Sequence, residues 1–135
     1  MEIKLKLRDA MAANAAFAQC ESVKDAKTRW NIVKNKRVLQ AHADDYEELR
    51  VKLVLELSPE NKDISKEGVA VQEKFRTHTK ELLDAECPSA GLLTVDKKHI
   101  LEANVSLHIV EAIFPFIVDK EDVCQKSDSP EQPKS

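Results

Sequence analysis

The chain has 135 residues, of which 42% are hydrophobic and 33% are charged, and its net charge is −3. This length and balance are typical of one globular domain and exclude a disordered chain. The weak net charge provides no general attraction to nucleic acid or to an acidic membrane. The sequence contains only two glycines, which disfavours a fold of many short strands joined by turns and favours helices.

A short strand is expected at the N-terminus, over residues 2–7, because aliphatic and charged side chains alternate there. The same residues are also compatible with the first turns of a helix. An alanine-rich helix is predicted next, from Asp9 to Glu21.

A long amphipathic helix is predicted from about Lys24 to Leu57, with Ser22 as its N-cap residue. No Gly or Pro interrupts this stretch, and Ser58-Pro59 ends it. Some 33 residues make a helix of roughly 50 Å, which is longer than the rest of a small domain can cover. The helix therefore bends, or one end protrudes. The residues expected on its inner face are Trp30, Val33, Arg37, Gln40 or Ala41, Tyr46, Leu49, Leu53 and Leu57.

The second half of the chain is expected to begin with a polar loop over residues 58–68 and a helix over residues 71–85. A strand over residues 92–95 follows. The apolar stretch 105–118 predicts a short buried helix that Pro115 kinks or ends. The side chains expected to point inward from that helix are Leu107, Val110, Ile113, Phe114 and Ile117.

These elements predict a mainly α fold: a helical hairpin or bundle with one long central helix and one or two short strands. Residues 1–118 are expected to form the single domain. Residues 119–135 are polar and are expected to form a flexible tail.

The chain contains no motif for catalysis or for a cofactor. There is no GxSxG, P-loop or GxGxxG sequence, and the four histidines share no metal-ligand spacing. The three cysteines are far apart and include no CxxC pair, which is typical of reduced intracellular thiols. No apolar run approaches the ~20 residues of a membrane span. We expect neither an enzyme nor a metal or membrane protein.

A basic cluster in the first half of the long helix is the clearest candidate site, with Lys27, Arg29, Trp30, Lys34 and Arg37 as its proposed binding residues. Cations beside an aromatic ring suit an anion, such as a nucleotide or an acidic protein surface. The alternative is a solvated helix face whose charges pair with a neighbour, with Trp30 as a core anchor.

A second candidate surface lies near the end of the long helix. Val51, Val54 and Leu55 add more apolar side chains than one narrow stripe accommodates. If these side chains are exposed, they mark a surface for a partner or for self-association. The alternative is that the C-terminal helix covers them.

The order of these features resembles a family of small, uncharacterised bacteriophage proteins. The residues that carry the resemblance are Met1–Leu7, Trp30-Asn31-Ile32-Val33-Lys34-Asn35-Lys36, Phe75, Glu81-Leu82-Leu83-Asp84, Leu92–Val95 and Ile113-Phe114-Pro115-Phe116-Ile117. The chain departs from the family pattern in its alanine-rich helix and its polar tail. The resemblance implies a phage origin and a non-enzymatic role, in the virion or in the host cytoplasm.

The function expected from the sequence is a phage-encoded binding protein, virion-associated or accessory. It would act through the long helix on a phage or host protein, and as a homo-oligomer. Nucleic acid is not an expected partner. The alternative is an anti-defence inhibitor that binds a host immune protein, or that sequesters a small anionic signal with Lys27, Arg29, Lys34 and Arg37.

Overall fold

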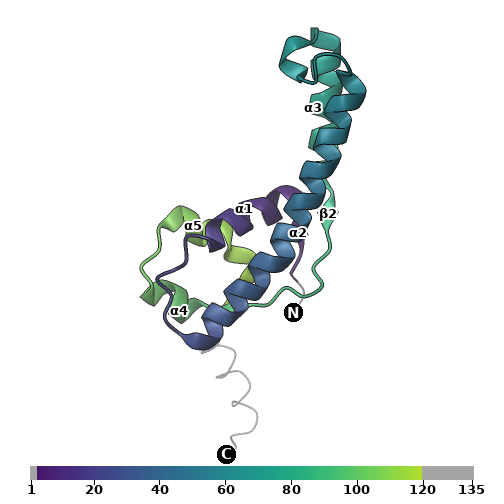
Figure 1. The fold of residues 1–135 in the computed structure, drawn as a ribbon. Coiled ribbons are helices and arrows are strands. Elements are labelled where there is room, and N and C mark those ends of the chain that lie inside the picture. The colour runs from purple at the N-terminus through teal and green to yellow at the C-terminus, as the bar shows by residue number, and fades with distance from the viewer. Residues whose placement is uncertain (1–2, 120–135) are drawn as a thin grey trace, which may run out of the picture.

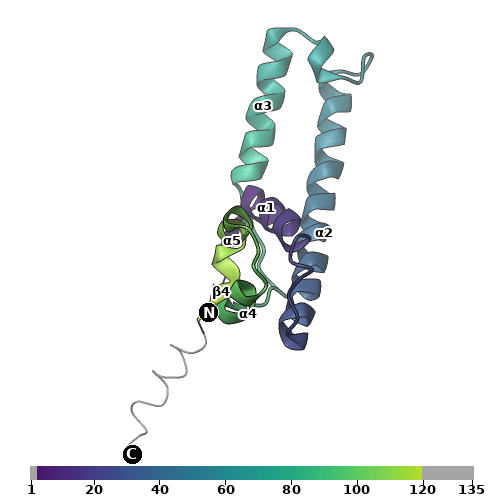
Figure 2. The same ribbon diagram turned by 90° about the vertical axis from the view of Figure 1, so that its left-hand side faces the viewer.

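The computed structural model describes residues 3–119, and its fold is mainly α, as the sequence predicted. The longest helix, α2 (Ala26–Leu57), is unbroken over 32 residues. It runs antiparallel to α3 (Val69–Asp84), and together they form a hairpin that projects from a small body (Figures 1 and 2). The connection between them contains the 3₁₀ helix η1 (Ile64–Lys66). One end of α2 therefore protrudes, which the length of the helix had indicated.

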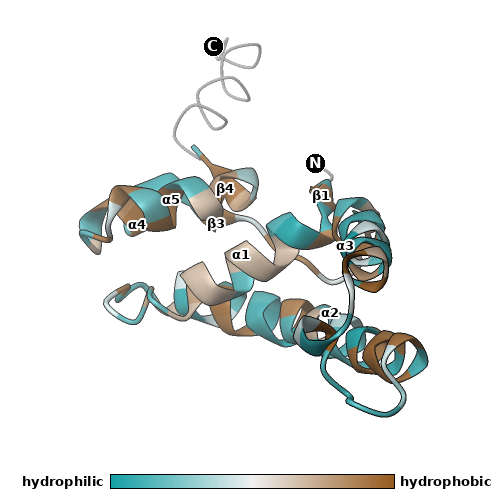
Figure 3. Cartoon of the chain, turned by 90° about the horizontal axis from the view of Figure 1, so that it is seen from above, coloured by the Kyte–Doolittle hydropathy of each residue, from teal (hydrophilic) through white to brown (hydrophobic). Residues whose placement is uncertain are grey.

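Helix α1 (Leu7–Phe17) lies in the middle of the body. Figure 3 shows it between α2 on one side and α5 (Leu107–Ala112) with β4 (Ile117–Val118) on the other. Its buried residues are Ala10, Ala13, Ala16 and Phe17. Small side chains on a helix enclosed from two sides let both layers approach closely. The alanine-rich composition of this segment is thus a packing requirement.

Two short ladders hold the non-helical segments. Strand β1 (Leu5–Lys6) pairs antiparallel with β2 (Glu86–Cys87), which follows α3 and joins the hairpin to the body. Strand β3 (Val95–Asp96) pairs in parallel with β4. On the buried side, the rings of Phe17 and Phe116 meet edge to face with centroids 5.0 Å apart. Phe116 belongs to the 3₁₀ helix η2 (Phe114–Phe116).

Several predicted boundaries at the N-terminus were wrong. Within the described residues, the strand expected over 2–7 is reduced to β1, and α1 begins at Leu7, where the Asp9 carboxylate accepts a hydrogen bond from the Lys6 backbone N–H. The N-cap residue of α2 is Asp25, whose carboxylate accepts from the Thr28 backbone N–H at 3.0 Å. Ser22 does not cap α2. Its hydroxyl donates to the Ala103 carbonyl.

The short helix predicted within residues 105–118 is present and ends before Pro115, but it is shorter and less buried than expected. Helix α5 ends at Ala112, and Pro115 lies in η2, because its ring removes the backbone donor that a continuing helix needs. Ile113 is buried as expected, but Leu107 and Phe114 are 72% and 68% exposed.

The helix expected over 71–85 corresponds closely to α3. The strand expected over 92–95 was wrong except at Val95, because β3 comprises Val95 and Asp96, and the short helix α4 (Lys97–Glu102) was not predicted. Residues 120–135, most of the expected tail, lie outside the described residues.

Replacing a buried alanine of α1 tests its role as a thin central helix. Ala13 has no exposed surface, so Ala13→Leu forces α2 and α5 apart. We expect a loss of about 1–3 kcal/mol in the free energy of unfolding, measured by urea denaturation. The control is Ala15→Leu, on the exposed side of the same helix, which should change stability little. Equal effects of the two substitutions would contradict this packing.

Candidate functional site on the long helix

The inner face of α2 is partly polar. Its buried residues are Thr28, Ile32, Asn35, Leu39 and Leu53. Of the residues expected on the inner face, Leu53 is buried, whereas Trp30 is 59% exposed and Val33 is also exposed. Arg37, Gln40, Ala41 and Leu49 are exposed as well. The predicted stripe was therefore wrong through the first half of the helix and at Leu49 in the second half. Trp30 is not a core anchor.

Asn35 explains this rotation of the helix. Its side chain is fully buried, and its amide Nδ2 donates to the Leu93 carbonyl at 2.8 Å while the Leu93 N–H donates to its Oδ1 at 2.7 Å. Four residues earlier, Asn31 donates to the Thr94 carbonyl at 3.0 Å. The segment before β3 thereby obtains partners for its backbone from the side of α2. The inner face of α2 combines these amides with the buried aliphatic residues Ile32, Leu39 and Leu53.

The first turn of α2 extends these polar contacts. The Thr28 hydroxyl donates to the Asp25 carboxylate and lies 3.0 Å from Nδ1 of His99 in α4. Beside Asn35, Gly91 adopts φ +85°, and a side chain there would lie 3.2 Å from Val38. The segment 91–99 is thus fitted closely to one side of α2.

The opposite side of α2 carries what we call the outward stripe. Successive members are four and three residues apart, and at about 100° per residue they share one face that points away from Thr28 and Asn35. Lys34 is half-buried, and the other members are exposed. In Figure 2, α1, α3, α4 and α5 lie on one side of α2, and the connection that follows α2 extends past its other side at the upper end. The members are Trp30, Lys34, Arg37, Ala41, Asp44, Glu48, Val51 and Leu55.

The predicted basic residues are not held by acidic neighbours. Within residues 3–119, no carboxylate forms an ion pair with Lys27, Arg29, Lys34 or Arg37. The Lys34 ammonium lies 5.0 Å from the centre of the Trp30 ring, a cation–π contact that explains its partial burial. The charge pairing that would make this an ordinary solvated face is therefore absent from the described part of the chain.

The acidic half of the helix is different, because its charges are paired locally. Arg50 donates to Glu47 and lowers the pKa of that carboxyl, and Lys52 lies 3.3 Å from Glu48. Helix α2 thus presents unpaired cations in its first half and partly compensated carboxylates in its second half.

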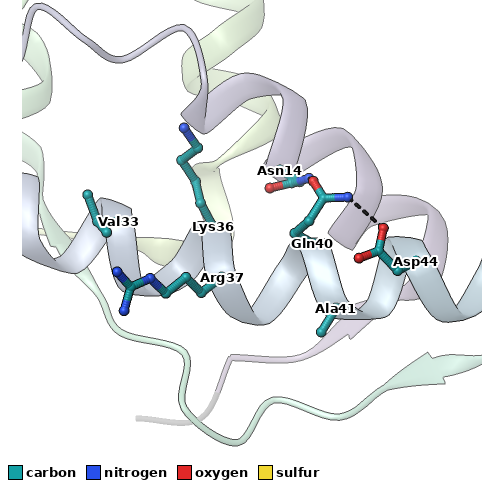
Figure 4. A pocket seen from close by; sticks show the side chains of 7 residues that line it. All are labelled: Asn14, Val33, Lys36, Arg37, Gln40, Ala41 and Asp44. Carbon is teal, nitrogen blue, oxygen red and sulfur yellow. Dashed lines mark hydrogen bonds between the residues drawn. The ribbon is translucent and has the colours of Figure 1, made fainter.

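An open groove of about 500 Å³ lies between α1 and α2, beside the basic residues (Figure 4). Lys36 and Arg37 line it, but its amides are already engaged: Asn14 donates to Gln40, and Gln40 donates to Asp44, each at 2.9 Å. The Asp44 carboxylate lines the same groove. A small anion would meet two cations here, Lys36 and Arg37, and the opposing carboxylate of Asp44.

The predicted apolar residues line one groove of about 330 Å³ near the end of α2, together with Ile64 of η1 and Phe75 of α3. Val51 and Leu55 are 42% and 46% exposed there, and Val54 is half-buried. The C-terminal helix does not cover this end of α2, since α5 contacts α1 in the body.

The described residues show little provision for chemistry. Among residues 3–119, no three His, Cys, Asp or Glu side chains are grouped to hold a metal ion. Cys20 and Cys87 are free and buried, and burial raises the pKa of both thiols, which keeps them in the unreactive neutral form. None of the described helices has the length and apolar character needed to cross a membrane.

Comparison of the chain with protein-family models, with curated proteins and with solved structures finds no match. The resemblance to small phage proteins therefore stays a prediction from sequence pattern.

Substitution of Asn35 tests the polar contact that orients the helix. Asn35→Ala removes both hydrogen bonds to Leu93. We expect it to lower the free energy of unfolding by about 1–3 kcal/mol in denaturant titrations. Asn31→Ala is the control, because it removes one bond from a half-buried site and should cost less. An Asn35 variant as stable as the wild type would show that these bonds do not set the packing of α2.

A second prediction concerns the base of the hairpin, where Asp84 of α3 accepts hydrogen bonds from Lys80 and from Arg8 of α1. These bonds, that of Lys80 first, lower the pKa of Asp84. A lowered carboxyl pKa stabilises the fold above the ordinary aspartate range near pH ~4, and this stabilisation is lost as the pH falls through the lowered value.

We expect Asp84→Asn to lower the unfolding midpoint at neutral pH, with the difference from wild type shrinking in acid. Glu81→Gln, on the exposed side of α3, should show no such pH-dependent difference. A constant offset for Asp84→Asn at all pH values would contradict the assignment.

Proposed function

We propose that this protein is a non-enzymatic binding protein that contacts another protein through the outward stripe of α2. The observation that carries the proposal is the exposure of this stripe along an unbroken helix, with a tryptophan, two aliphatic side chains and cations that no carboxylate among residues 3–119 pairs. Trp and Arg are the residues that most often dominate the binding energy of protein interfaces.

The distribution of charge favours a protein over a small anion. At about 100° per residue, Lys27 and Arg29 project to opposite flanks of the stripe, so the cations do not converge on one point. The neighbouring groove contains the Asp44 carboxylate. The acidic second half of the stripe would also repel a nucleic-acid backbone. An extended surface with both signs of charge suits a partner that carries the complementary pattern.

The biological setting of the proposal comes from the sequence pattern. A phage-encoded protein that acts in the virion or in the host cytoplasm agrees with the resemblance described above. An inhibitor that binds a host immune protein would use the same stripe. The geometry gives less support to an inhibitor that sequesters a nucleotide signal.

Substitution within the stripe tests the proposal directly. We expect the double variant Trp30→Ala, Arg37→Ala to bind its protein partner at least about tenfold more weakly, because each side chain is an expected anchor. Partners would be captured from cells that produce the protein, and their affinities would be measured with purified components. The control is Leu107→Ala, which removes an equally exposed apolar side chain from α5.

Equal retention by the double variant and the control would contradict a role for the stripe. Calorimetric titration with mono- and dinucleotides tests the alternative, an inhibitor that sequesters a nucleotide signal. Our proposal predicts no heat of binding in this titration. A nucleotide that binds the wild type and fails to bind the variant Lys36→Ala, Arg37→Ala would favour sequestration instead.

A further inference from the structure

The order of basic, acidic and apolar residues along the outward stripe points to one particular binding partner. Its first half carries Lys34 and Arg37, and its second half carries Asp44 and Glu48. Apolar side chains stand at both ends, with Trp30 at one end and Val51 and Leu55 at the other. The spacing of four and three residues is symmetric about a point between His42 and Ala43.

We propose that the outward stripe pairs with the same stripe of a second copy of this chain, in antiparallel orientation. The inference rests on the proposed function and names the partner of its surface. A two-fold axis through the midpoint of the stripe places Arg37 of each copy opposite Glu48 of the other and brings the apolar residues Trp30 and Leu55 together, while the charged Lys34 and Asp44 each face an apolar residue. The facing residues are Trp30 with Leu55, Lys34 with Val51, Arg37 with Glu48, and Ala41 with Asp44.

The alternative orientation is disfavoured by the same residues. In a parallel pair, each side chain faces its own copy, so Arg37 would face Arg37 and Glu48 would face Glu48. Like charges placed opposite each other disfavour an interface. The sign change halfway along the stripe therefore selects the antiparallel pair.

The shape of α2 is compatible with this contact. Spacing of four and three residues is typical of the seam of a coiled coil, and the stripe spans 26 residues, or about 38 Å from Trp30 to Leu55. The buried residues Thr28 and Asn35, and likewise Ile32, Leu39 and Leu53, repeat at multiples of seven on the opposite face. One left-handed supercoil of the helix axis keeps both faces aligned. Near the middle, Ala41 is small enough for two helices to approach closely.

The existing contacts of the stripe do not oppose the pairing. Glu48 is paired with Lys52, but both side chains are more than half exposed, and such ion pairs contribute little. Glu48 can therefore exchange this contact for the unpaired Arg37 of the second copy. Salt should weaken the dimer, because its central layers are charged and close to solvent.

Charge reversal provides the test, with molar mass measured by sedimentation equilibrium from micromolar to millimolar concentration. We expect the wild type to form dimers. Arg37→Glu alone and Glu48→Arg alone should each weaken dimerisation at least tenfold, since each places two like-charged pairs at the interface. The double variant Arg37→Glu, Glu48→Arg should recover dimerisation, because both pairs are restored with reversed signs.

Controls with the same charge changes are Lys98→Glu and Glu102→Arg, on the exposed surface of α4. Both should dimerise as the wild type does. Trp30 is the sole tryptophan of the chain, so its fluorescence should shift to longer wavelength as the wild-type dimer is diluted. Circular dichroism confirms that each variant is folded.

A wild type that stays monomeric at every concentration would overturn the inference, as would a double variant no better than the single ones. If a monomeric wild type still captures a different protein through Trp30 and Arg37, self-pairing is wrong and the proposed function stands. Loss of both properties contradicts both proposals.

Discussion

The reciprocal hydrogen bonds between the Asn35 side chain and the Leu93 backbone determine how α2 is rotated about its own axis. They place an amide at a fully buried position and hold the segment before β3 against the helix. A helix has only one inner face, so the residues 200° away must face solvent. Trp30 and the rest of the outward stripe are exposed as a direct consequence. The surface that we propose for binding thus follows from a contact inside the core.

The small size of the body is the second reason why the outward stripe is exposed. Helix α1 is lined with alanine, which lets α2 and α5 pack close to it from both sides. The layers that cover α2 therefore remain on one side, and the body ends well before Leu57. Beyond the body, α2 is accompanied by α3 alone (Figure 2). A long helix covered on one side by so small a protein leaves much of its other side exposed, except near Val51 and Leu55, which line a groove with residues 62–65.

Local sequence signals predicted those helices whose bounds depend on helix-breaking residues or on helical periodicity. The absence of Gly and Pro from the long helix, and Ser58-Pro59 after it, identified α2 almost to the residue. The helical period of Val71, Phe75 and Leu82 identified α3. The stretch 105–118 misled because its high apolar content suits a buried helix, while Pro115 divides it and leaves Phe114 exposed. The sequence identified the basic cluster. It did not show that Lys34 and Arg37 lie on the outward stripe while Lys27 and Arg29 project to its two flanks.

The sequence by itself determined the helical class, the unbroken length of α2 and the change of charge sign along it, because these depend on residue propensities and spacing. Tertiary structure alone decided which face of α2 points inward. Hydrophobic periodicity favours burial of Trp30 and Val33, whereas in the structure Asn31 and Asn35 turn toward the segment before β3 and bond the backbone of Leu93 and Thr94. These bonds join two segments about 60 residues apart in the chain, so no local sequence pattern reveals which face of α2 they select.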